Sequence, residues 1–159
     1  MKINYTNDID FQFLVKDIAQ HPEYQRLRGL FHHEHSIYDH CMCVAWLSFK
    51  IARTLKLRVK DIVRGALLHD FYFYSWRDKN RRPKSHAYNH PRTAYDNAVN
   101  YFGPLTKVES DIILKHMWPF TVVPPKYLES SIVSLIDKIV AIKGLGVEIT
   151  RKTVKWLRK

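Results

Sequence analysis

The sequence predicts an all-α protein, and three observations support this. Only five glycines occur in 159 residues, no stretch alternates polar and apolar residues as a strand does, and several windows carry apolar residues at intervals of three and four. With 46% hydrophobic residues, the chain suits one globular domain over residues 1–159. We expect a bundle of about six to seven helices, at residues 8–19, 39–56, 59–72, 91–101, 107–117, 129–143 and 147–158.

The expected helix at residues 39–56 places a histidine on its apolar face. Residues three, four and seven apart share one side of a helix. The apolar face runs through Val44, Leu47 and Ile51, and His40 continues it one turn earlier. This position makes His40 a candidate inward-facing ligand.

The expected helix at residues 59–72 ends its apolar face with a polar pair. Ile62 and Ala66 lie on that face, and His69 and Asp70 occupy its next turn. One such pair is usually structural. Polar groups on the inward sides of several helices are harder to explain by packing alone.

Two more histidines lie near the helices expected at 91–101 and 107–117. His90 precedes Pro91, and proline suits the first turn of a helix, so His90 is expected at a helix entrance. His116 follows Ile112 and Ile113 at helical spacing, so it lies on an apolar face. Both are candidate ligands.

The last candidate ligand is a carboxylate inside the helix expected at 129–143. Asp137 lies in IVSLIDKIVAI, four residues after Val133 and three before Val140, where an aliphatic residue would be expected. Burying an ionised carboxylate is costly unless it is paired, hydrogen-bonded or bound to metal. A separate basic helix is expected to follow at about 147–159.

Composition favours a cytoplasmic protein with an anionic partner. No stretch approaches the roughly 20 apolar residues that span a bilayer, and the start of the chain does not resemble a signal peptide, so no membrane partner is expected. Cys41 and Cys43 are two apart in an expected helix and cannot bridge each other. The formal charge of +11 favours an anionic partner, and charge alone does not choose between a phosphorylated metabolite, a nucleotide and nucleic acid. Nucleic acid is possible but is not the favoured partner. The oligomeric state stays open.

Together, these residues resemble the pattern of the HD-domain metal-dependent phosphohydrolases, which carry an isolated histidine, an adjacent His-Asp pair and a later aspartate on helices. His40 lies in SIYDHCMCVAWLSFKIA, the pair lies in GALLHDFYF, and Asp137 lies in SLIDKIVA. The extra histidines, His90 in HAYNHPRTAYDNA and His116 in DIILKHMWPF, resemble those of two-metal members. The resemblance covers about residues 32–142 and implies a single HD-domain bundle.

The resemblance implies two divalent metal ions. The first would be held by His40, His69, Asp70 and Asp137, and the second by Asp70, His90 and His116, with Asp70 as the bridge. Imidazole and carboxylate ligands without thiolate favour iron or manganese, leave zinc, cobalt and nickel as alternatives, and argue against calcium.

The implied activity is hydrolysis of a phosphoester or phosphoanhydride in a small phosphorylated metabolite, with a nucleotide favoured, by a metal-activated hydroxide. His69, Asp70 and His86 are the expected catalytic residues. Basic residues are expected to bind substrate phosphates. They lie in the loop 74–90 and beside Asp137, and are Arg77, Arg81, Arg82, Lys84 and Lys138. Aromatic residues beside the His-Asp pair are expected to line the pocket, namely Phe71, Tyr72, Phe73, Tyr74 and Trp76.

Two other readings of the resemblance stay open. The ligand order is also similar to that of inositol oxygenase, which implies a di-iron oxygenase, and a non-catalytic module binding nucleotide or nucleic acid is the third hypothesis. Among hydrolases, the order resembles enzymes acting on symmetric dinucleoside polyphosphates. The chain reads SHAYNHP where HD-GYP enzymes carry their GYP signature, so a cyclic dinucleotide is less favoured. The cluster His32–His35 could border the site.

Overall fold

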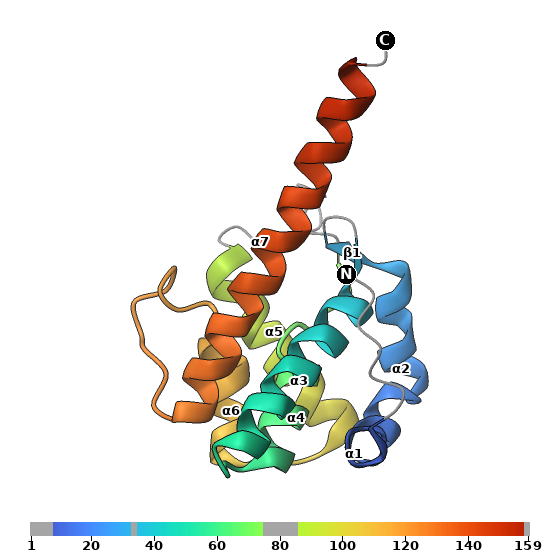
Figure 1. The fold of residues 1–159 in the computed structure, drawn as a ribbon. Coiled ribbons are helices and arrows are strands. Elements are labelled where there is room, and N and C mark those ends of the chain that lie inside the picture. The colour runs from blue at the N-terminus through green and yellow to red at the C-terminus, as the bar shows by residue number, and fades with distance from the viewer. Residues whose placement is uncertain (1–7, 33–34, 75–85, 158–159) are drawn as a thin grey trace.

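The computed structural model describes residues 8–32, 35–74 and 86–157, and it describes side chains for 8–31, 36–74 and 87–143. Within these residues the chain forms seven α-helices, one 3₁₀ helix and two short strands (Figure 1). In chain order they are α1 Ile9–Ala19, α2 Pro22–Gln25, η1 Arg26–Gly29, β1 Phe31–His32, β2 His35–Ser36, α3 Ile37–Thr54, α4 Val59–Leu68, α5 His86–Phe102, α6 Lys107–Lys115 and α7 Leu128–Leu157.

The predicted all-α class is confirmed. The strands β1 and β2 are two residues long and pair antiparallel, so they form only a small hairpin before α3. The 11 residues of α1 agree with the helix predicted at 8–19. The sequence reading missed the short elements α2, η1 and the hairpin because none of them is long enough to show a periodic pattern.

Side-chain caps explain where several helices begin. Asp8 accepts a hydrogen bond from the Phe11 amide at 3.1 Å before α1, and Ser36 accepts one from the Asp39 amide at 3.0 Å before α3. Thr106 precedes α6 and forms a reciprocal capping box with Glu109. These caps fix the starts of helices that carry or precede site residues.

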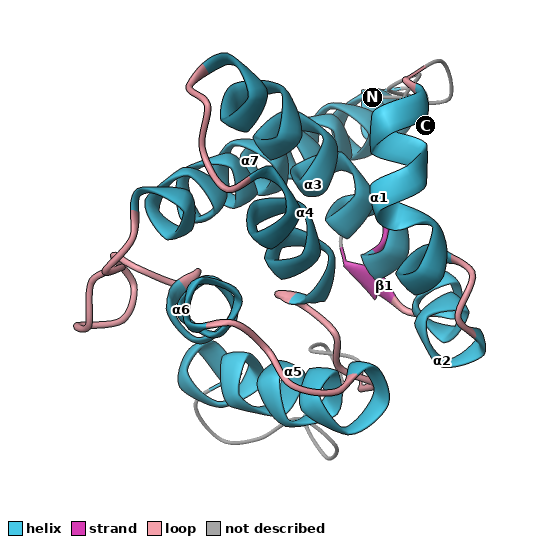
Figure 2. Ribbon diagram, turned by 90° about the horizontal axis from the view of Figure 1, so that it is seen from below, coloured by secondary structure: helices cyan, strands magenta, loops and turns pink. Residues whose placement is uncertain are grey.

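The centre of the bundle is α4, which packs against α3 on one side and α6 on the other (Figure 2). Gly65 allows the contact with α6, because a Cβ added there would lie 2.7 Å from Cδ1 of Ile112. The two helices that end in His69 and His116 therefore approach each other closely.

The predicted end of the fourth helix was wrong. The predicted segment 59–72 ends as a helix at Leu68, with His69 at the C-cap. The Phe71 amide then bonds to the Leu68 carbonyl and the Tyr72 amide to the Asp70 carbonyl, which turns the chain away from the helix axis. The polar pair therefore lies just beyond α4.

The predicted start of the fifth helix was also wrong. It begins at His86, not at 91, so Pro91 lies inside α5 and His90 lies in its second turn instead of at its entrance. Pro91 has no backbone amide to donate to the carbonyl of Ala87, the second residue of the helix. The missing hydrogen bond therefore lies near the start of α5, where its loss is best tolerated.

The predicted break between 143 and 147 is absent, because α7 is a continuous helix of 30 residues. Gly144 and Gly146 each cost about 1 kcal/mol relative to alanine but keep their backbone amides, so the helical hydrogen bonds can continue. The helix packs on the bundle through its first half and then projects beyond it (Figure 1). No helix in the described ranges is long and apolar enough to cross a bilayer.

Candidate metal centre

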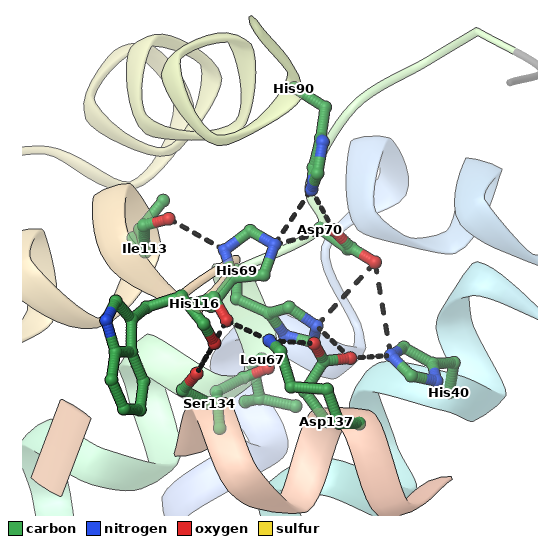
Figure 3. A network of polar contacts seen from close by, with 12 residues as sticks. His40, Leu67, His69, Asp70, His90, Ile113, His116, Ser134 and Asp137 are labelled. Carbon is green, nitrogen blue, oxygen red and sulfur yellow. Dashed lines mark hydrogen bonds and ion pairs between the residues drawn. The ribbon is translucent and has the colours of Figure 1, made fainter. Parts of the chain in front are cut away.

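The structure brings all six predicted metal ligands together in one buried cluster (Figure 3). They come from five parts of the bundle: α3, the turn after α4, α5, the end of α6, and α7. In that order they are His40, then His69 and Asp70, then His90, His116 and Asp137. Each is at most 9% exposed, so the cluster is shielded from bulk water.

Three of these residues form a first triad, His40, His69 and Asp137. Nε2 of His40 lies 3.0 Å from Oδ1 of Asp137, and Nε2 of His69 lies 3.7 Å from the same oxygen. One ligand atom from each residue lies within 4.8 Å of the others, which is close enough to share one ion.

The second triad is Asp70, His90 and His116. The Nε2 atoms of His90 and His116 are 2.8 Å apart. They lie 3.3 and 3.5 Å, respectively, from Oδ1 of Asp70. These three ligand atoms likewise point at a common centre.

Asp70 lies between the two triads. Its Oδ1 faces His90 and His116, whereas its Oδ2 lies 3.6 Å from Nε2 of His69 and 3.9 Å from Nε2 of His40. One carboxylate thus presents one oxygen to each group, which is the arrangement of a bridging ligand.

Backbone carbonyls fix the orientation of two of the histidines. Nδ1 of His69 donates to the Ala66 carbonyl at 2.7 Å, and Nδ1 of His116 donates to the Ile113 carbonyl at 2.8 Å. Each carbonyl belongs to the last turn of the helix before its histidine, where carbonyls lack helical partners. With the proton on Nδ1, Nε2 is free to bind a metal.

Two atoms of the cluster lack a hydrogen bond among the described residues. These are Nε2 of His69 and Oδ1 of Asp70, and both are buried. A buried polar atom without a partner is costly. A divalent cation coordinated by nitrogen and oxygen would satisfy both atoms, so the side chains fit a metal of this kind.

The two carboxylates remain charged. Burial alone would raise the pKa of Asp70, but the surrounding imidazoles, chiefly His69, outweigh it and hold that pKa well below its usual range. Burial also opposes ionisation of Asp137, but the hydrogen bond from His40 and the nearby ring of His69 lower its pKa well below the usual range. Both groups are therefore in the form that binds metal.

The imidazoles differ in their protonation. Burial, reinforced by His90 and His69, lowers the pKa of His116 to about 3, so its ring is neutral at ordinary pH. For His69 burial acts in the same direction, but the charge of Asp70 prevails and raises its pKa well above the usual value. The carboxylates thus favour positive charge at this position, which either a proton or a metal ion can provide.

Two residues of α7 hold the second triad against the first. Ser134 places its hydroxyl 2.8 Å from the His116 carbonyl and 2.7 Å from the Trp118 carbonyl. Lys138 donates to the His116 carbonyl and, at 3.2 Å, to Oδ2 of Asp137. The sequence reading missed Ser134, although its place three residues before Asp137 on the same apolar face was a signal. Whether Lys138 also contacts a substrate phosphate stays a prediction.

The aromatic residues after the His-Asp pair divide between the site and the core. Tyr72 lies 5.6 Å from the ring of His90 and packs on Tyr74 at 4.7 Å, as expected for residues beside the site. The expectation was wrong for Phe71, which packs in the core against Tyr24 and Phe102. The expectation was also wrong for Phe73, because its ring packs on that of Phe71.

Several predicted residues lie outside the described side chains. They are Trp76, Arg77, Arg81, Arg82, Lys84, His86 and the cluster His32–His35. Their predicted roles stay predictions.

Comparison with protein families agrees with this geometry. The model of one family, the HD domain, matches residues 37–142. Comparisons with curated proteins and with solved structures returned no significant match. The matched segment begins at the first residue of α3, includes every residue of both triads and covers about two thirds of the chain. HD domains form a superfamily of metal-dependent phosphohydrolases, and this chain belongs to the HD-domain family.

Proposed function

We propose that this protein is a metal-dependent phosphohydrolase with two divalent ions. It would cleave a phosphoester or phosphoanhydride in a small phosphorylated metabolite, with a nucleotide as the favoured substrate. The observation that carries the proposal is the position of Asp70, which presents Oδ1 to His90 and His116 and Oδ2 to His40 and His69. A cluster built for one ion would not need a carboxylate facing both groups.

The proposed ligand sets follow from these contacts. The first ion would be held by His40, His69, Asp70 and Asp137, and the second by Asp70, His90 and His116. Bound ions would supply an activated water as nucleophile and would neutralise charge on the phosphate. Iron or manganese is the favoured metal, and zinc, cobalt or nickel also suits imidazole and carboxylate ligands.

The protein groups have separate tasks in this proposal. His69 and Asp70 would be the central catalytic residues. Asp70 lies between the two triads, and Nε2 of His69 lies 3.6 Å from its Oδ2. The neutral ring of His116 leaves Nε2 available as a ligand. His86 and the basic residues Arg77, Arg81, Arg82 and Lys84 are proposed substrate contacts.

The partly exposed Tyr74 supports a nucleotide as substrate. It packs on the buried Tyr72, whose ring in turn lies beside that of His90, so Tyr74 is the partly exposed end of an aromatic pair next to the second triad. Burial, with a contribution from Asp70, raises the pKa of Tyr74 to about 12, so the ring is uncharged at neutral pH, as an ordinary tyrosine is, and stays uncharged in more alkaline solution. A neutral aromatic ring can stack on a base without repelling the phosphates.

The test is elemental analysis of protein purified without added metal, combined with phosphate release from a panel of nucleotides and sugar phosphates. We expect about two metal ions per chain and release of phosphate. His69→Ala and Asp70→Ala should abolish both. The matched control is His21→Asn, which replaces a histidine outside the site with another residue that can cap α2.

Other results would contradict the proposal in recognisable ways. Two irons without phosphate release would favour the di-iron oxygenase. Absence of metal under every loading condition would leave a binding module. One ion per chain with full activity would exclude the two-metal centre while preserving the hydrolase.

A further inference from the structure

Between Lys107 and Lys143, all of which is described, the exposed charge of the protein is positive. All four carboxylates of this segment are buried, namely Glu109, Asp111, Glu129 and Asp137. None of its five lysines is buried, and Lys107, Lys126 and Lys143 are exposed. A molecule that approaches this segment therefore meets its ammonium groups and none of its carboxylates.

The same segment carries a row of apolar side chains along the outer side of α7. Leu128, Leu135, Ile139 and Ile142 are 56, 61, 36 and 68% exposed. Ile132 lies between the first two and is partly buried. We call these five residues the α7 stripe. Their intervals are four, three, four and three residues, which is the a/d repeat that packs one helix against another.

Apart from Ile132, which packs against the core, the stripe lies outside the core, because α7 packs on the bundle through another face. Val133, Ile136 and Asp137 lie on that inner face and are at most 9% exposed. A helix with two apolar sides can bury both only against two neighbours. The outer side has no such neighbour among the described residues.

The loop before α7 extends the apolar surface. Trp118 and Phe120 are 42 and 67% exposed. The Trp118 carbonyl contacts Ser134, and the ammonium of Lys138 lies 5.9 Å from the ring centre of Phe120. These contacts place the loop next to the stripe, with Lys138 between them.

The repeat continues in the sequence beyond the bundle. Every seventh residue from Leu128 to the end of the chain is apolar, at Leu128, Leu135, Ile142, Ile149 and Trp156. The helix itself projects past the bundle along this part (Figure 1). A partner that followed the repeat would therefore find a helical backbone over its whole length.

We propose that the α7 stripe docks an acidic amphipathic helix of another protein. Apolar residues of that helix would pack between those of the stripe, and its flanking carboxylates would face the exposed Lys143, which follows Ile142 in the sequence. A second copy of this chain is a poorer occupant, because it would bring lysines against lysines on a protein of net charge +11.

The probe is a fluorescein-labelled synthetic peptide of about four heptads with leucine at a and d and glutamate at e and g. Glutamates on both flanks keep the peptide monomeric at neutral pH, so its anisotropy reports binding to the full-length protein. A scrambled peptide of the same composition is the control ligand. We expect micromolar affinity for the heptad peptide and about tenfold weaker binding at high salt.

Variants separate the two sources of affinity. Leu135→Glu should weaken binding at least about a hundredfold, because it removes apolar contact and adds repulsion. Lys143→Glu should weaken it about tenfold. Ile9→Glu, at a residue of α1 that is 84% exposed, makes the same change elsewhere and should leave binding unchanged. Circular dichroism would establish that each variant is folded.

Three results would overturn the proposal. The scrambled peptide could bind as tightly as the heptad peptide. Light scattering could show a dimer that Leu135→Glu dissociates, which would make a second copy the occupant. Vesicles of phosphatidylserine and phosphatidylcholine could bind through the stripe while the peptide does not, which would make it a lipid-binding face. Each readout is independent of metal content and phosphate release.

Discussion

Nε2 of His90 lies 2.8 Å from Nε2 of His116, and both nitrogens point at the same carboxylate oxygen of Asp70. Only one proton can lie between two imidazole nitrogens, and the Nδ1 of His116 already donates to a carbonyl. A cation held by both lone pairs would replace this contact with two coordinate bonds. This relationship gives the first prediction.

His116→Gln should remove about one metal equivalent per chain and leave the other. The glutamine cannot reproduce an imidazole ligand, whereas the first triad loses no member. Elemental analysis after removal of excess metal measures the change, and His21→Asn is the matched control. Unchanged stoichiometry would exclude His116 as a ligand.

The stability of the metal-free protein should fall as the pH decreases from about 6.5 towards 3. The pKa of His116 is about 3 in the folded protein, against 6.5 ordinarily, so the unfolded chain binds a proton that the native protein does not. Stability then decreases by up to about 1.4 kcal/mol per pH unit within this range. His69 does not oppose the effect, because its raised pKa leaves it protonated in both states below 6.5.

Urea unfolding with a chelator present, between pH 4.5 and 6.5, would measure this slope. The low pKa values of Asp70 and Asp137 contribute only near and below the ordinary pKa of 3.8, so this range isolates the histidine. His116→Gln should flatten the curve. Equal slopes for both proteins would mean that His116 does not stay neutral in the folded state.

The inward-facing ligands could be predicted from the sequence because helical spacing shows which side chains share a face. His40 and Asp137 replace apolar residues in the middle of a regular pattern, so their burial was evident. Their assignment to two ions came from family resemblance. The spacing alone does not show that Asp70 lies between the triads.

The helix limits near the site could not be predicted because tertiary contacts decide them. The His69 ring bonds to the last turn of α4 and the chain leaves the helix there, although the apolar pattern continues to Phe71 and Tyr72. Pro91 gave a misleading signal, since its preferred place is the first turn and here it lies within α5. In this longer helix, Nε2 of His90 lies 3.3 Å from Oδ1 of Asp70.

Gly65→Ala should destabilise the protein by about 1–3 kcal/mol, the usual cost of overpacking a core. The new methyl would lie 2.7 Å from Cδ1 of Ile112 and force α4 away from α6. Because these helices end in His69 and His116, the variant should also bind metal more weakly. Gly29→Ala is the control, since a Cβ there meets nothing within 4 Å.

Chemical denaturation and metal titration measure the two effects of Gly65→Ala. Combining it with Ile112→Val, which removes the closest atom, should recover part of the loss, and a double-mutant cycle gives the coupling. A Gly65→Ala protein as stable as Gly29→Ala would show that α4 and α6 do not need this close approach.

Lys138→Met should weaken metal binding at both triads, whereas Lys138→Arg should retain part of it. The ammonium links the His116 carbonyl to Oδ2 of Asp137, so it holds one residue of each ligand set, and its side chain is only 17% exposed. Methionine keeps the volume but donates no hydrogen bond, which leaves both acceptors without this donor.

Two measurements separate a role of Lys138 in positioning ligands from a role in contacting a substrate phosphate. They are the metal affinity, from competition with a chelator, and the KM for the hydrolysed substrate. If Lys138 positions ligands, metal affinity falls and KM at saturating metal changes little. If instead it contacts a substrate phosphate, KM rises while metal affinity stays the same, and the positioning role would be excluded.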